Sequence, residues 1–306
     1  MEEQTRSHAG GLPFPGCLVA AALVLVFVDT GFICSGLCSA RRGFGVAMSC
    51  PARGCQNRRM ETAEFIEVLR REGLLLADAA GQARLTAKVP PCPGWQVRDL
   101  VRHQGVVHRW AARFVTEGRT DAARMEEDAP EDGVLLSWFR EGHARLVDGL
   151  AAAPPDLDCW YFLPAPSPLA FWTRRQAHET TVHRVDAEAA LGKDLTPIGT
   201  AFASDGVDEL LTGFHVRAKS RVRSDRPRSL RVRAVDAPAG QGDWLMHLTA
   251  DPLRTERAGM GPADCTVRGT AAELYLALWN RGPYEGLEVS GDTSLVELWQ
   301  RTAAVI

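Results

Sequence analysis

Helical periodicity dominates the chain between residues 62 and 191 and limits the folds that it can adopt. Apolar residues recur every three or four positions in four segments: residues 62–84, a segment that begins just after Trp95, residues 133–152 and residues 169–191. Proline-rich or acidic stretches separate these segments. A helix with an apolar stripe must bury that stripe against another element. Four such helices, each of about twenty residues, predict a four-helix bundle.

The pattern changes after Gly192, where the fourth segment ends. One more helix is expected over residues 200–219. Apolar and polar residues then alternate over residues 230–235 and 244–248, which predicts strands. Further strands are expected at residues 265–268 and 287–289, with helices at 271–279 and 293–304. The predicted fold class is therefore α + (α+β): a bundle over residues 60–192, followed by a small α+β domain over residues 200–306.

Residues 1–59 differ from the rest of the chain. They contain five of the eight cysteines, and the spacing of these cysteines is too loose to favour a zinc site. The apolar run over residues 17–28 is shorter than the roughly 20 residues that span a bilayer. Glu2 and Glu3 ahead of it weaken its interpretation as a signal peptide. We expect an N-terminal extension, disordered or due to a mis-assigned start, with the functional protein beginning near Met60.

Charge and cysteine usage narrow the expected partners and compartment. The chain has 35 basic and 38 acidic side chains, and this balance argues against a nucleic-acid partner. Three isolated cysteines after residue 60 favour a reducing, cytoplasmic setting. No stable membrane association is expected, and a membrane anchor in the N-terminal run is the least favoured interpretation.

The fourth helical segment places ionisable side chains on its apolar face. Glu179, His183 and Asp186 fall on the same arc as Trp172 and Ala187 at 100° per residue. An unpaired buried carboxylate costs several kcal/mol, so Glu179 needs a compensating partner. A divalent metal would provide one, because Glu and His at i and i+4 can bind one ion. A hydrogen-bonded Glu–His pair without metal explains the pattern equally well.

A third ligand would favour the metal, and the neighbouring segments offer three histidines. His103 and His108 lie in the second segment, and His143 lies in the third. The spacing does not choose among them. His178 and Glu179 also begin the H-E-x-x-H pattern of zinc proteases, but position 182 is valine, which excludes that class.

Two bundle segments and the C-terminal tail carry a family resemblance. Residues 89–103 (VPPCPGWQVRDLVRH) and 171–188 (FWTRRQAHETTVHRVDAE) resemble the mycothiol-dependent maleylpyruvate isomerase family, and residues 265–292 are similar to its C-terminal domain. The resemblance implies a DinB-like bundle followed by a domain shaped like a sterol carrier protein. It also implies a divalent metal, typically zinc, held by His103, Glu179 and His183 with one coordination position open. Gln96 and Val185 depart from the family pattern, which has a capping Ser or Thr and often a tryptophan there.

The resemblance further implies an enzyme with mycothiol as its thiol cosubstrate. A metal-bound thiol loses its proton near neutral pH and adds to a small electrophile, giving cis–trans isomerisation or S-transfer. Arg281 is the candidate catalytic residue, because a guanidinium suits a substrate carboxylate. Asp186 is a candidate partner of His183. The alternative is a non-catalytic module of the same fold that binds metal, an apolar ligand or a partner protein.

Overall fold

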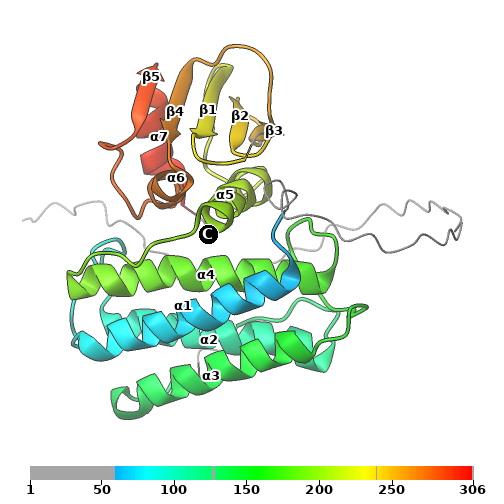
Figure 1. Ribbon diagram of the computed structural model, residues 1–306, viewed down its shortest axis with the longest axis vertical. Coiled ribbons are helices and arrows are strands. Elements are labelled where there is room, and N and C mark those ends of the chain that lie inside the picture. Colours follow the sequence, from blue (N-terminus) through cyan, green and yellow to red (C-terminus); the bar gives the residue numbers. More distant parts are fainter. Residues whose placement is uncertain (1–58, 126–127, 239, 305–306) are drawn as a thin grey trace, which may run out of the picture.

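Four long helices and a mixed sheet form two stacked units (Figure 1). The computed structural model describes residues 59–125, 128–238 and 240–304. The expected N-terminal extension, including its apolar run and its cysteines, lies outside these residues. The bundle helices are α1 (Thr62–Gln82), α2 (Val97–Glu117), α3 (Asp132–Ala152) and α4 (Pro168–Leu191). The predicted four-helix bundle followed by a small α+β unit is confirmed.

Local signals explain where α2 and α4 begin and where α4 ends. The Ser167 side chain accepts a hydrogen bond from the backbone N–H of Ala170 at the start of α4, and Gly192 ends the helix with a φ of 70°. At the start of α2 the Asp99 carboxylate accepts a hydrogen bond from the Gln96 backbone N–H at 2.9 Å. This bond occupies a donor at the helix start even though Gln96 replaces the usual Ser or Thr.

Helix α4 is buried on two sides because it lies between the two units. It packs alongside α1, with α2 and α3 forming the other layer of the bundle, while α5 lies over it (Figure 1). Phe171 and Trp172 belong to the bundle core, whereas Val182 belongs to the core of the C-terminal unit. The single apolar arc inferred from the sequence is therefore only one of two buried faces of this helix.

The C-terminal unit is a five-stranded sheet covered by helices. The strands are β1 (Arg228–Ala234), β2 (Asp243–Leu248), β3 (Arg254–Arg257), β4 (Cys265–Gly269) and β5 (Glu288–Gly291), in the order β3-β2-β1-β4-β5. Strands β1 and β4 are parallel, and the other pairs are antiparallel. The helices α6 (Ala271–Leu278) and α7 (Ser294–Thr302) bury Tyr275 and Trp299 in its core.

One prediction for this unit was wrong in detail, and one strand was not predicted. The helix expected over residues 200–219 is α5 (Thr200–Glu209), which continues only as the short π-helix η2 (Leu210–Phe214). Strand β3 was missed, because its sequence Arg-Thr-Glu-Arg lies at the sheet edge, is at most half-buried and shows no apolar alternation.

Three further features of the described residues concern membrane spans, cysteines and the loop before α4. Among the helices of the described residues, none combines the length and the hydropathy needed to cross a bilayer. Cys92, Cys159 and Cys265 are buried thiols without a disulfide. The aromatic loop before α4 packs on the bundle through Trp160 and Phe162.

Candidate metal centre

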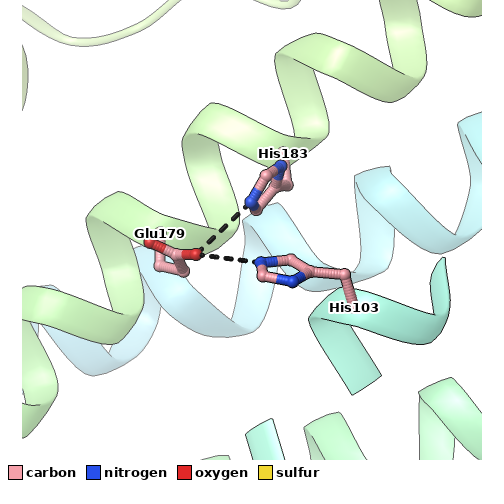
Figure 2. Close-up of side chains that lie close together, drawn as sticks. All are labelled: His103, Glu179 and His183. Carbon is pink, nitrogen blue, oxygen red and sulfur yellow. Dashed lines mark ion pairs between the residues drawn. The ribbon is translucent and has the colours of Figure 1, made fainter. Parts of the chain in front are cut away.

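Helices α2 and α4 bring His103, Glu179 and His183 together (Figure 2). The Glu179 Oε1 atom lies 3.5 Å from His103 Nε2 and 3.3 Å from His183 Nε2. Glu179 and His183 are one turn apart on α4, so their side chains lie one above the other. His103 reaches them from α2, which packs against α4. One potential ligand atom from each residue lies within 4.8 Å of the others.

The spacing and chemistry of these donors fit a divalent cation. Ligand atoms at about 2.0–2.1 Å from a tetrahedral zinc lie about 3.3 Å from each other. The two oxygen–nitrogen separations, 3.5 and 3.3 Å, match that edge length. Two imidazoles and one carboxylate form a donor set typical of catalytic zinc sites, which keep a fourth position for water or substrate. Within residues 59–125, 128–238 and 240–304, this is the one cluster of three or more such donors.

The other two candidate histidines make different contacts. His108 is fully buried and its Nε2 atom lies 2.9 Å from the Thr180 hydroxyl. His143 Nε2 lies 3.0 Å from the backbone oxygen of Leu69. Burial lowers the pKa of both imidazoles, which keeps them neutral in the bundle core. Of the three histidines left open by spacing, only His103 is brought to the Glu179–His183 pair.

Asp186 orients His183 from the side opposite Glu179. The His183 Nδ1 atom lies 2.9 Å from Asp186 Oδ2, which leaves Nε2 facing Glu179 and His103. Burial would lower the pKa of His183, but the hydrogen bonds to Asp186 and Glu179 outweigh it and raise the pKa to about 9. A carboxylate behind a ligand histidine fixes the ring orientation and strengthens the ligand.

Arg281 reaches the same carboxylate from the C-terminal unit. Its Nε and Nη2 atoms donate to the two Asp186 oxygens at 2.9 and 3.1 Å, and Nη1 donates to the Trp279 backbone oxygen at 3.0 Å. Burial alone would raise the pKa of Asp186, but Arg281 and His183 lower it to about 2. Arg281 therefore contacts Asp186, and Asp186 in turn contacts the candidate metal ligand His183.

Electrostatics keep Glu179 ionised although its side chain is only 24% exposed. Burial would raise the pKa of this carboxyl, but hydrogen bonds from both imidazoles and the charge of Arg175 hold its pKa well below the ordinary range. Arg175 Nη2 donates to Glu179 Oε2 at 3.0 Å. An ionised carboxylate is the form that binds a cation.

Several residues of the site were missed by sequence reasoning. Arg175 precedes Glu179 by one turn, and this i,i+4 spacing of opposite charges was an available signal. The Trp95 ring lies 5.1 Å from the His103 ring and is stacked 6.1 Å from the His183 ring, so it forms a wall of the site. Cys92 Sγ lies 3.4 Å from Asp186 Oδ2, and burial raises the pKa of this thiol to about 12. Trp95 and Cys92 precede α2, where helical periodicity carries no information.

Comparisons with known proteins identify the family. The family model described as "Mycothiol maleylpyruvate isomerase N-terminal domain" matches residues 66–188, and "MDMPI C-terminal domain" matches residues 201–298. The chain belongs to the mycothiol-dependent maleylpyruvate isomerase family. The resemblance of its sequence motifs to this family is thereby confirmed. A search of curated proteins finds no match to this family member.

Two solved structures share the fold. The crystal structure of the mycothiol-dependent maleylpyruvate isomerase aligns with a TM-score of 0.52 and 14% sequence identity. That of a histidine-to-alanine mutant of the isomerase aligns with a TM-score of 0.54 and 13% identity. Each alignment covers 76% of this chain and 93% of the solved one. At this identity the likeness establishes the common fold of both units.

Proposed function

We propose that this family member is a metal- and mycothiol-dependent enzyme that activates a thiol for addition to a small electrophile. The observation that carries the proposal is the convergence of His103, Glu179 and His183 at the spacing of ligands to one cation. Zinc is the metal we favour, because two imidazoles and one carboxylate suit it. Three protein ligands would leave one tetrahedral position for the thiol.

The protein would supply a preorganised ligand set. A bound divalent cation would lower the pKa of a coordinated thiol, so that a thiolate is available near neutral pH. Asp186 holds the His183 ring with Nε2 toward the centre. Arg175 keeps Glu179 charged and oriented, and the Trp95 ring limits solvent on one side. These contacts hold the three side chains toward one another, which reduces the reorganisation that binding requires.

The reaction class follows from thiol addition. In an isomerisation, sulfur adds to one carbon of a cis double bond, the resulting single bond rotates, and elimination restores the double bond in trans and returns the thiolate. In an S-transfer, the adduct takes up a proton and leaves. The solved structural neighbours carry the name of the isomerase, and isomerisation is the activity we propose first.

Arg281 is the residue we propose for the anionic end of the substrate. Its Nε and Nη2 atoms donate to Asp186, Nη2 also donates to Cys92 Sγ, and Nη1 donates to the Trp279 backbone oxygen. We propose that the second N–H of Nη1 binds a substrate carboxylate while Nε and Nη2 stay bound to Asp186. A charge-assisted bond of this type is roughly twice as strong as a neutral one.

A small electrophile and mycothiol are therefore the partners that we propose, without nucleic acid or stable membrane association. A low-molecular-weight thiol is maintained in a reducing compartment, which supports a cytoplasmic location. The three thiols at Cys92, Cys159 and Cys265 are compatible with it.

Metal analysis of the full chain tests this proposal. After zinc loading and dialysis, the wild type should retain about one equivalent, as expected for a single three-ligand site. His183→Ala should lose it, whereas His247→Ala should not, because His247 lies on β2 and contacts Glu256. A wild type without zinc, or equal zinc in both variants, would refute the site.

Turnover is tested next, with mycothiol and maleylpyruvate and then with other electrophiles. We expect trans product or consumption of the thiol, abolished in His183→Ala. Zinc binding without turnover of any electrophile would instead favour the non-catalytic module.

A further inference from the structure

Arg175 connects a candidate metal ligand to the C-terminal unit. Its side chain is 3% exposed, and Nη2 donates to Glu179 Oε2 at 3.0 Å. Nη1 donates to the Glu209 carboxylate at the end of α5. The guanidinium carbon also lies 5.0 Å from the Phe214 ring centroid and 5.5 Å from that of Trp279. Glu209, Phe214 and Trp279 all follow the bundle, so three parts of the C-terminal unit hold this bundle arginine.

The hydrogen bond from Arg175 gives the two carboxylate oxygens of Glu179 different partners. Oε1 faces the imidazoles of His103 and His183, while Oε2 is held by Arg175. A carboxylate can bind a cation through one or both of its oxygens, and two-oxygen binding would occupy an additional coordination position. The guanidinium is planar and rigid, so it directs its donors to Glu179 and Glu209 at a fixed angle. Because Oε2 is engaged, Oε1 is the atom available to a cation.

We propose that Arg175 is a positioning residue that holds Glu179 as a one-oxygen ligand and makes metal affinity depend on the docked C-terminal unit. This inference rests on the metal site of the proposed function. Glu209, Phe214 and Trp279 hold the guanidinium, the guanidinium holds Oε2, and Oε1 is thereby kept toward the histidines. The coordination position that a second carboxylate oxygen would occupy stays open for the thiol.

The preceding residue supplies a matched control. Arg174 also reaches from α4 to α5, and it donates to Asp205 at 2.7 Å and to Asp208 at 3.2 Å. It therefore joins the same two units by partly buried ion pairs. Among the described residues, the hydrogen bonds and ion pairs of Arg174 go to Asp205 and Asp208, and none goes to His103, Glu179 or His183. Loss of Arg174 tests the general value of ion pairs between the units, and loss of Arg175 adds the release of Glu179.

The experiment compares Arg175→Met with Arg174→Met in the full chain. Zinc affinity is measured by competition with a chromophoric chelator, and coordination is measured from the visible spectrum of the Co²⁺ form. We expect Arg175→Met to weaken zinc binding about 10–100-fold, the usual effect of losing a partner of a ligand. Its Co²⁺ absorption should fall in intensity, as expected when a second oxygen binds. Arg174→Met should keep the wild-type affinity and spectrum.

A second variant covers the case in which Arg175→Met does not fold, since it leaves the Glu209 charge buried and unpaired. Arg175→Met combined with Glu209→Gln removes both charges and should show the same loss of affinity and the same spectral change. Wild-type affinity and spectrum in this double variant would overturn the inference, as would equal losses from the Arg174 and Arg175 variants. A wild type that binds neither metal overturns the proposed function itself, which is a distinguishable result.

Discussion

Replacing Asp186 by asparagine tests how strongly the C-terminal unit supports His183. The Asp186 side chain is fully buried, accepts two hydrogen bonds from Arg281 and lies 2.9 Å from His183 Nδ1. Asp186→Asn keeps the size of the side chain but removes its charge. Loss of the carboxylate behind a ligand histidine weakens metal binding about 10–100-fold, which corresponds to about 1.4–2.8 kcal/mol.

The same substitution has a calculable effect on the stability of the metal-free protein. The pKa of Asp186 is lowered from 3.8 to about 2. This difference corresponds to about 2.5 kcal/mol of stability, because each pKa unit is worth about 1.4 kcal/mol. Since the folded pKa is the lower one, this stability is present above the pKa of the unfolded chain and is lost as the pH falls toward 2. Asp186→Asn should therefore lower the unfolding free energy at pH 7 by about that amount.

Glu188→Gln is the control for this experiment. Glu188 is also a buried carboxylate on α4, and it accepts hydrogen bonds from Arg184 and Thr196. Urea unfolding of the metal-free proteins should show a loss of stability in both variants, whereas chelator competition should show weaker zinc binding only in Asp186→Asn. Unchanged zinc affinity in Asp186→Asn, or an equal loss in both, would refute the role of Asp186 behind His183.

Two further predictions concern residues away from the site. Burial lowers the pKa of His215 from 6.5 to about 4, so the unfolded chain binds more protons than the folded one between these pH values. The free energy of unfolding should therefore fall by about 3 kcal/mol as the pH decreases through that range. His215→Gln should remove this part of the pH dependence in denaturant titrations at pH 7 and pH 4, and an unchanged pH dependence would contradict the assignment. On α1, a Cβ at Gly73 would lie 2.2 Å from His143 Nε2, whereas the nearest side-chain atom to a Cβ at Gly81 is 3.7 Å away. Thermal unfolding should show that Gly73→Ala lowers the free energy of unfolding by about 1–3 kcal/mol and that Gly81→Ala raises it by about 0.5–1 kcal/mol. A lower free energy of unfolding in both variants would show that the limited space around Gly73 is not the cause.

The helices were predicted more reliably than the connections and the sheet edge. Apolar spacing located the bundle helices, because each must bury one side, and Gly192 marked the end of α4. Strand β3 carries no apolar alternation, because it lies at the sheet edge. Leu210, where α5 changes to a π-helix, is buried in the C-terminal core, and this change is not visible in residue spacing.

For the candidate site, spacing predicted the pair on α4 but not its third member. Glu179 and His183 are one turn apart, so helical geometry alone places them on one face. Periodicity did not separate His103 from His108, because both are on α2 and the choice depends on how α2 packs against α4. The family resemblance indicated His103, and the packing brings that residue to the pair while His108 contacts Thr180.

The sequence by itself determined the local elements and the donors that share a helix face, because both follow from contacts between residues a few positions apart. Tertiary structure alone decided which distant groups meet those donors. Arg281 is 95 residues from Asp186, and Glu209 is 34 residues from Arg175. Whether such groups lie within hydrogen-bond distance depends on how the C-terminal unit docks on α4, and that docking is set by the packing of two cores rather than by any local pattern.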